Sequence, residues 1–270
     1  RFTDVYKLNL FDYKKEISKS SVITPALGYN PDDGVSLGLS YNTTTNGFQR
    51  NPFSQQHRFK GGYFFATNGF SIEYNGEFAN IMNDWNLHIG GRFTSENFTN
   101  NFFGFGNETI NPDDELDFDY NRVRTSIYEA NFGILKKGNF GSDYGFKTII
   151  QGIKLEDTAD RFITDFVSGD NREFFERRFF GALEANYNYL SYDKKLNPTR
   201  GMVFGLNIGV RTEIDNTDYT YGYLNSNLGF YNALSGNRKL VLKTDVRTQL
   251  RFGNDLLFYQ AANIGSGSGL

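Results

Sequence analysis

The residue types that most often catalyse reactions or bind metals are sparse in this chain. It has two histidines, His57 and His88, and no cysteine. Neither histidine lies in a metal-binding pattern such as HExxH. The stretch NLHIGGRF around His88 offers no serine that could complete a Ser-His-Asp hydrolase site. We therefore predict no catalytic residue, no cofactor, no metal site and no enzymatic activity.

Two acidic stretches could in principle bind Ca²⁺ through carboxylate and carbonyl oxygens, namely NPDDG from residue 30 and NPDDELDFD from residue 111. Neither has the ligand spacing of an EF-hand loop, so a solvated loop is the favoured interpretation. The formal net charge of the chain is only -3, which gives no reason to expect a polyanionic partner such as nucleic acid.

The charges with informative spacing alternate with apolar residues. In KLVLKTDVRTQLRF, residues 239–252, one face carries mainly Leu, Val, Thr and Phe, and the other carries mainly Lys, Asp, Gln and Arg. A period of two indicates a strand whose faces meet different surroundings. The same pattern recurs in FSIEYNGEFA, WNLHIGGRF and MVFGLNIGVRTE. The charged residues predicted to share the wetter, lumen-facing side are Glu73, Glu77, Arg92, Arg211, Lys239, Lys243, Asp245, Arg247 and Arg251.

Alternation alone does not distinguish a transmembrane barrel from a sandwich, whose apolar faces meet in a core. The strand length favours the barrel, because a tilted transmembrane strand needs about 9–11 residues and a common globular strand has about 5–6. The composition agrees, with 28 Phe, 17 Tyr and 29 Gly among 270 residues. No run approaches the roughly 20 apolar residues of a membrane-spanning helix. The predicted fold class is an all-β transmembrane antiparallel β-barrel.

The pattern predicts eleven strands and no helix of any length. Long polar connections follow the fifth and seventh strands, and compact turns follow the sixth, eighth and tenth, as expected when the first strand enters from the periplasm. The connection TTTNGFQRNPFSQQ after the second strand is long for a periplasmic turn. The predicted strands are 21–29, 34–42, 57–66, 70–80, 85–95, 122–135, 144–156, 179–192, 202–213, 221–232 and 239–252.

Pro25 lies inside the first predicted strand, where it cannot donate a ladder hydrogen bond. One interpretation is a bulge or a strand start. The other is that this strand forms one side of a weakly paired seam.

Four stretches resemble the Omp85 outer-membrane proteins, the superfamily of the assembly factor BamA and of D15-type bacterial surface antigens. SVITPALGYNPDDGVSLGLSYN resembles the family's first hairpin, and FFGFGNET the opening of its third external loop. NYNYLSYDKKLNPTRGMVFGLNIGV resembles its eighth and ninth strands with their Pro-x-x-Gly turn. DLLFYQAANIGSGSGL resembles the sixth external loop just before its Arg-Gly-Phe/Tyr signature.

The resemblance implies a sixteen-stranded barrel of which about eleven strands are present, with residues 1–20 a linker from an upstream periplasmic part. Residues 21–270 would be the N-terminal portion of the barrel, ending inside the sixth loop, and Arg-Gly-Tyr or Arg-Gly-Phe would follow. It assigns Gly265, Gly267 and Gly269 to the start of that loop. It also implies a lateral gate on the first strand, formed by Val22, Thr24, Pro25, Leu27 and Tyr29.

The resemblance further implies a protein of the bacterial outer membrane that inserts or translocates polypeptides. Its partners would be outer-membrane lipid, client polypeptides, and periplasmic or surface accessory subunits, with no nucleic acid. Two alternatives stay open: a passive porin-like channel, and a membrane anchor for an upstream phosphoesterase-like domain. The composition, rich in Asn, Lys, Phe and Tyr, resembles that of Bacteroidota proteins.

Overall fold

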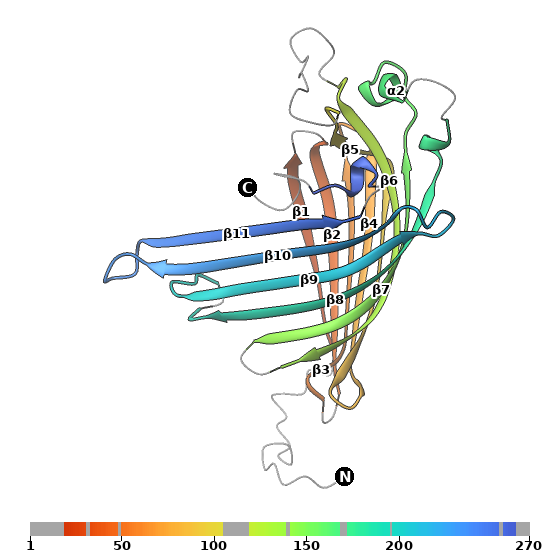
Figure 1. Cartoon of the computed structure of the whole chain (residues 1–270). Coiled ribbons are helices and arrows are strands. Elements are labelled where there is room, and N and C mark those ends of the chain that lie inside the picture. Colours follow the sequence, from red (N-terminus) through yellow and green to blue (C-terminus); the bar gives the residue numbers. More distant parts are fainter. Residues whose placement is uncertain are drawn as a thin grey trace. The chain divides into compact units, whose positions relative to one another are not determined.

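In the computed structural model, the described residues are 19–30, 33–47, 50–104, 119–138, 141–167, 172–194, 196–253 and 256–262. They form eleven long strands, one short helix, and two short 3-10 turns (Figure 1). The strands are β1 (Lys19–Asn30), β2 (Gly34–Gly47), β3 (Arg50–Phe64), β4 (Gly69–Met82), β5 (Trp85–Asn101), β6 (Arg122–Lys137), β7 (Ser142–Leu155), β8 (Arg178–Tyr192), β9 (Gly201–Glu213), β10 (Thr220–Ala233) and β11 (Val241–Phe252).

The strands follow one another in the sheet in chain order, from β1 to β11. Antiparallel registers join β1 to β2, β2 to β3 and β3 to β4, and likewise β8 to β9, β9 to β10 and β10 to β11. A meander of this kind needs only local connections, so each strand pairs with the one that the chain has just built. All eleven predicted strands are present.

The chain divides into two compact units, which we describe separately. The first contains residues 1–81, 89–130 and 152–178. Its long connection after β7 includes helix α2 (Phe162–Phe166), which packs against the end of β5. The rings of Phe162 and Phe166 lie 5.8 and 5.6 Å from that of Phe102. Arg177 fastens the same connection to the sheet, since it bonds Ser126 at 2.6 Å and lies 4.0 Å over the ring of Tyr128.

The second unit contains residues 82–88, 131–151 and 179–270. Its main feature is the four neighbouring strands β8 to β11 (Figure 1). A described segment after β11, residues 256–262, contains the 3-10 turn η2 (Phe258–Gln260). This segment lies against the polar face of these strands, where Arg251 of β11 donates a hydrogen bond to the Gln260 backbone oxygen.

The turn between β8 and β9 is held by one carboxylate. Asp193 accepts hydrogen bonds from the Thr199 hydroxyl at 2.5 Å, from the Thr199 N–H at 2.8 Å and from the Arg200 N–H at 3.1 Å. These donors favour the ionised form and therefore lower the pKa of Asp193. Gly201 then starts β9 at φ +148, and a Cβ there would collide with the Ser191 carbonyl oxygen.

Three details differ from the sequence-based prediction. The connection expected to be long after the second strand is mostly strand, because β2 runs to Gly47 and β3 starts at Arg50. Its Thr and Gln residues suit a strand as well as a loop, and no apolar alternation marked them. Lys239 lies in the turn before β11, where its N–H bonds the Asn237 side chain. Helix α2 was not expected, and its five residues are too few to show a helical period.

Candidate functional site

The strands of both units expose their apolar faces. Leu37 and Ile72 in the first unit, and Leu183, Ile208 and Val246 in the second, are all exposed. In the second unit the apolar residues stand opposite one another across strands, for example Leu183 with Val210 and Leu228 with Val246. A sandwich would bury such a face against a second sheet. The exposed apolar face is therefore a surface to be covered by something outside the described chain.

Aromatic rings form rows along this apolar face in the first unit. Tyr41, Phe59 and Tyr74 stand opposite one another on β2, β3 and β4, with ring centroids 6.3 and 4.8 Å apart. A second row runs from Phe70 through Phe93 to Tyr128, with centroids 5.2 and 4.8 Å apart. Aromatic rows on an outward face are typical of the interfacial girdles of membrane barrels.

The opposite face is polar, and several of its charges are paired within each unit. In the first unit Lys60 lies 3.5 Å from Glu73, and Arg92 lies 3.6 Å from Glu129. In the second unit Asp245 lies 3.6 Å from both Lys243 and Arg247. Five of the residues proposed from the sequence to face the lumen are thus components of ion pairs, namely Glu73, Arg92, Lys243, Asp245 and Arg247.

The most connected part of the polar face spans β8, β9 and β10. Glu184 stands opposite Gly209, and Gly209 stands opposite Tyr223. A Cβ at Gly209 would lie 2.5 Å from the end of the Tyr223 ring. Because glycine leaves that space open, Tyr223 reaches across β9 and donates a 2.8 Å hydrogen bond to Glu184. Lys147 of β7 completes the group with a 2.8 Å contact to the same carboxylate.

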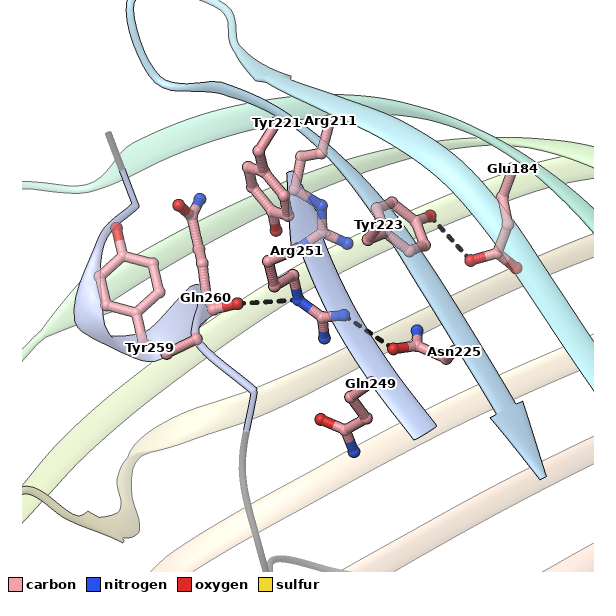
Figure 2. Close-up of a pocket in the computed structure, with 10 residues that line it drawn as sticks. Glu184, Arg211, Tyr221, Tyr223, Asn225, Gln249, Arg251, Tyr259 and Gln260 are labelled. Carbon is pink, nitrogen blue, oxygen red and sulfur yellow. Dashed lines mark hydrogen bonds between the residues drawn. The ribbon is translucent and has the colours of Figure 1, made fainter. Parts of the chain in front are cut away.

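Beside this group lies a polar pocket of about 310 Å³, lined by Arg211, Tyr221, Tyr223, Arg251 and Gln260 among others (Figure 2). Arg251 of β11 links segment 256–262 to β10. Its Nε donates to the Gln260 backbone oxygen at 3.1 Å, and its Nη1 donates to the Asn225 side chain at 2.8 Å. Arg211 donates from Nη1 to Gln151 of β7 at 2.8 Å. Segment 256–262 also contacts β8, since the ring of Tyr259 meets that of Phe180 edge-to-face with centroids 6.4 Å apart.

The residues proposed for the gate lie on β1, at one end of the strand order. β1 pairs with β2 from Lys19 to Asn30 without a shift in register, and Pro25 stands opposite Leu39. The bulge interpretation of Pro25 is therefore wrong. Proline is tolerated within a strand at a sheet edge, which is where β1 lies in the described chain. Pro25, Leu27 and Tyr29 share the apolar face, and Val22 and Thr24 share the other.

The two histidines lie on different strands, His57 on β3 and His88 on β5. His57 stands on the apolar face, where its Nδ1 lies 3.0 Å from the Tyr74 hydroxyl and its ring meets Phe78 edge-on at 5.4 Å. Among the described residues, no group of three His, Asp or Glu side chains has the arrangement of a metal site. Gly265, Gly267 and Gly269 lie outside the described residues, as does most of the predicted linker 1–20. Across the described part of the chain, no helix has the length and apolarity needed to span a membrane.

Comparison with known proteins supports the fold. No family model and no curated protein matches the sequence. A solved structure that does match is that of BamA from Haemophilus ducreyi lacking POTRA domains 1–3, with a TM-score of 0.63 and 16% sequence identity. The match covers 93% of this chain and 45% of that one, so this chain spans less than half of its structural neighbour. The fold of this chain is similar to that of part of the BamA β-barrel. The fold class predicted from the sequence is thus confirmed. The comparison gives no support to an origin from a Bacteroidota bacterium, which stays a prediction from composition.

The sequence placed Arg211 and Arg251 of the polar pocket on the lumen-facing side, but it did not point to the other residues of the pocket. Glu184, Tyr223 and Gln260 come from two strands and a later segment, and only the registers bring them together. One signal was available: glycine at position 209 in the middle of a predicted strand indicates a close approach by another group.

Proposed function

We propose that this chain is the outer-membrane part of an Omp85-type protein of a bacterial outer membrane, and that it inserts or translocates polypeptides without covalent chemistry. The observation that carries the proposal is a BamA-like fold whose strands, 12 to 17 residues long, expose their apolar faces. Strands of that length exceed the roughly 9–11 residues needed to cross a bilayer. Outer-membrane lipid would cover the apolar face, and water would cover the polar one.

The gate would lie at β1. An edge strand presents unpaired N–H and C=O groups, and a client strand can pair with them by β-augmentation. Pro25 removes one donor from such an edge, which lowers the cost of separating whatever strand pairs there. The side chains around it are neutral from Val22 to Tyr29, so no ion pair would need to break on opening.

Cysteine cross-linking tests the gate, because the chain has no cysteine of its own. Leu27 of β1 and Leu37 of β2 stand opposite each other and both face outward, with exposures of 80% and 54%. A client strand paired to β1 would lie about 5 Å from Leu27 and about 10 Å from Leu37, since neighbouring strands are about 4.8 Å apart.

The intact protein would be reconstituted in lipid vesicles with a denatured outer-membrane barrel protein that carries one cysteine in its terminal strand. We expect disulfide formation with Leu27→Cys and not with the control Leu37→Cys. Equal cross-linking of both variants, or of neither while the client inserts, would exclude β1 as the templating edge.

The same preparation separates the two alternatives. A passive porin would show a large, steady single-channel conductance and no effect on client insertion. A membrane anchor would show neither a steady conductance nor an effect on client insertion. The upstream sequence separates the cases as well, since phosphoesterase-like metal motifs there would favour the anchor and periplasmic POTRA repeats would favour polypeptide insertion. Accessory subunits of the periplasm or the cell surface would co-purify with the intact protein.

A further inference from the structure

The polar pocket contains hydrogen-bond donors with no acceptor among the described residues. Gln260 is 5% exposed, and its Oε1 accepts the Leu257 N–H at 3.2 Å. Only the carbonyl end of the amide can accept that bond, so the NH₂ end is fixed on the opposite side. This Nε2 has no hydrogen-bond partner in the described part of the chain. A buried donor left without a partner costs free energy comparable to a lost hydrogen bond.

Arg211, which lines the same pocket, also has a buried donor without an acceptor among the described residues. Arg211 uses Nη1 for Gln151, but its Nε is buried and has no partner among the described residues. Arg211 and Gln260 both line one pocket of about 310 Å³, which matches the lower end of the size range of small-molecule sites. Two donors from separate segments that both lack an acceptor point to one missing acceptor group.

The charges of the pocket select the kind of acceptor. Arg211 and Arg251 bring two guanidinium groups, and the carboxylate in the lining, Glu184, is already contacted by Lys147 at 2.8 Å. The pocket therefore has a surplus of positive charge. A carboxylate matches it, because two oxygens can accept from a guanidinium and an amide at once. A doubly charged phosphate would suffer more from the nearby Glu184.

We propose that the polar pocket binds a carboxylate group, held by Arg211 Nε and Gln260 Nε2 with Arg251 as the second positive charge. The carboxylate comes either from an acidic side chain of the protein's own polypeptide or from a small free carboxylate. The proposal does not depend on the role of β1, because it concerns the contacts of β8 to β11 and segment 256–262 alone.

The test follows the Arg211 Nε–H directly. The intact protein, labelled with ¹⁵N-arginine and folded in detergent micelles, is titrated with sodium acetate against sodium chloride at constant ionic strength. We expect a saturable shift of the Arg211 Nε–H resonance with acetate. The Arg247 resonance serves as the internal control, because Arg247 stands on the same face and pairs with Asp245 at 3.6 Å.

Two variants probe the second donor. Gln260→Leu removes it, and acetate binding should weaken about ten- to a hundredfold, as expected for the loss of one hydrogen bond to a charged group. Gln260→Glu keeps the size and the acceptor for the Leu257 N–H but adds a negative charge, so the acetate response should disappear. Should Gln260→Leu fail to fold, as judged by its gel mobility before and after heating, Gln260→Glu still decides the question.

The two sources give different results. A small free carboxylate is supported by the saturable acetate response. An acidic side chain of the protein itself is supported by an Arg211 Nε–H that exchanges slowly with water and ignores acetate. An Nε–H that exchanges rapidly and ignores acetate would overturn the proposal, whatever the outcome of the β1 cross-linking.

Discussion

Replacing an outward residue with arginine measures directly whether lipid covers the apolar face. Ile208 lies in the middle of β9, with Ala185 and Leu224 opposite it on the two neighbouring strands. Ile208 is 47% exposed, so about half of it is buried in the protein. Ile208→Arg loses the free energy of that burial, about 1 kcal/mol, in any solvent. A lipid-facing arginine near the bilayer midplane costs about 2–4 kcal/mol more. The expected loss in a membrane is therefore about 3–5 kcal/mol.

Asn207→Arg is the matched control, since Asn207 is the preceding residue at the same depth and faces the opposite, polar side, between Asn186 and Asn225. It should cost about 0.5 kcal/mol or less, as surface substitutions usually do. The free energy of unfolding of both variants is measured by denaturant titration of the intact protein in lipid vesicles, with circular dichroism as the readout. If the two costs differ by less than about 1 kcal/mol, the apolar face does not meet lipid.

Four further predictions concern packing and turns. Tyr223→Phe removes its bond to a carboxylate and should lower stability by about 1.5–3 kcal/mol in the same titration, and Gly209→Ala should cost about 1–3 kcal/mol by displacing that ring. Asp193→Asn should lower the unfolding midpoint at pH 7; since the folded pKa is lowered, this difference should persist above about pH 4 and shrink as the pH falls further. Gly201→Ala should cost about 1–3 kcal/mol because of its positive φ, whereas Gly181→Ala, with open space around its Cβ, should be close to neutral.

The strands could be predicted because a period of two is a local property of the sequence. Stretches such as residues 70–78 and 202–213 alternate over nearly their full length, and the structure has strands there. The ends of β2 and β3 were missed, since their Thr, Asn and Gln residues have no apolar partners to alternate with. The pattern also predicted which residues of each strand share the apolar face. It did not show whether lipid or a second sheet covers that face, because the surroundings of a strand are not encoded in a local pattern.

Only Arg211 and Arg251 of the candidate site could be placed on the polar face from the sequence, because the rest of the site depends on register. Glu184, Gly209 and Tyr223 are aligned by pairings over about 40 residues of chain, and a shift of one residue would turn each side chain to the other face. The contact of segment 256–262 with Arg251 is closer in the chain, but it requires the chain to fold back over a finished strand. Composition and spacing therefore do not show which of these residues come into contact.

The contacts across strands differ between β1 and the second unit in a way that bears on the gate. In the described chain, the side-chain hydrogen bonds between β1 and β2 join neutral hydroxyl groups, Ser21 with Thr43 at 3.1 Å and with Tyr41 at 3.3 Å. Such exposed neutral bonds contribute less to stability than hydrogen bonds to charged groups in partly buried surroundings. The Tyr223–Glu184–Lys147 group links β7, β8 and β10 by the stronger kind. The side-chain contacts that hold β1 to β2 are therefore of a weaker kind than those that link β7, β8 and β10.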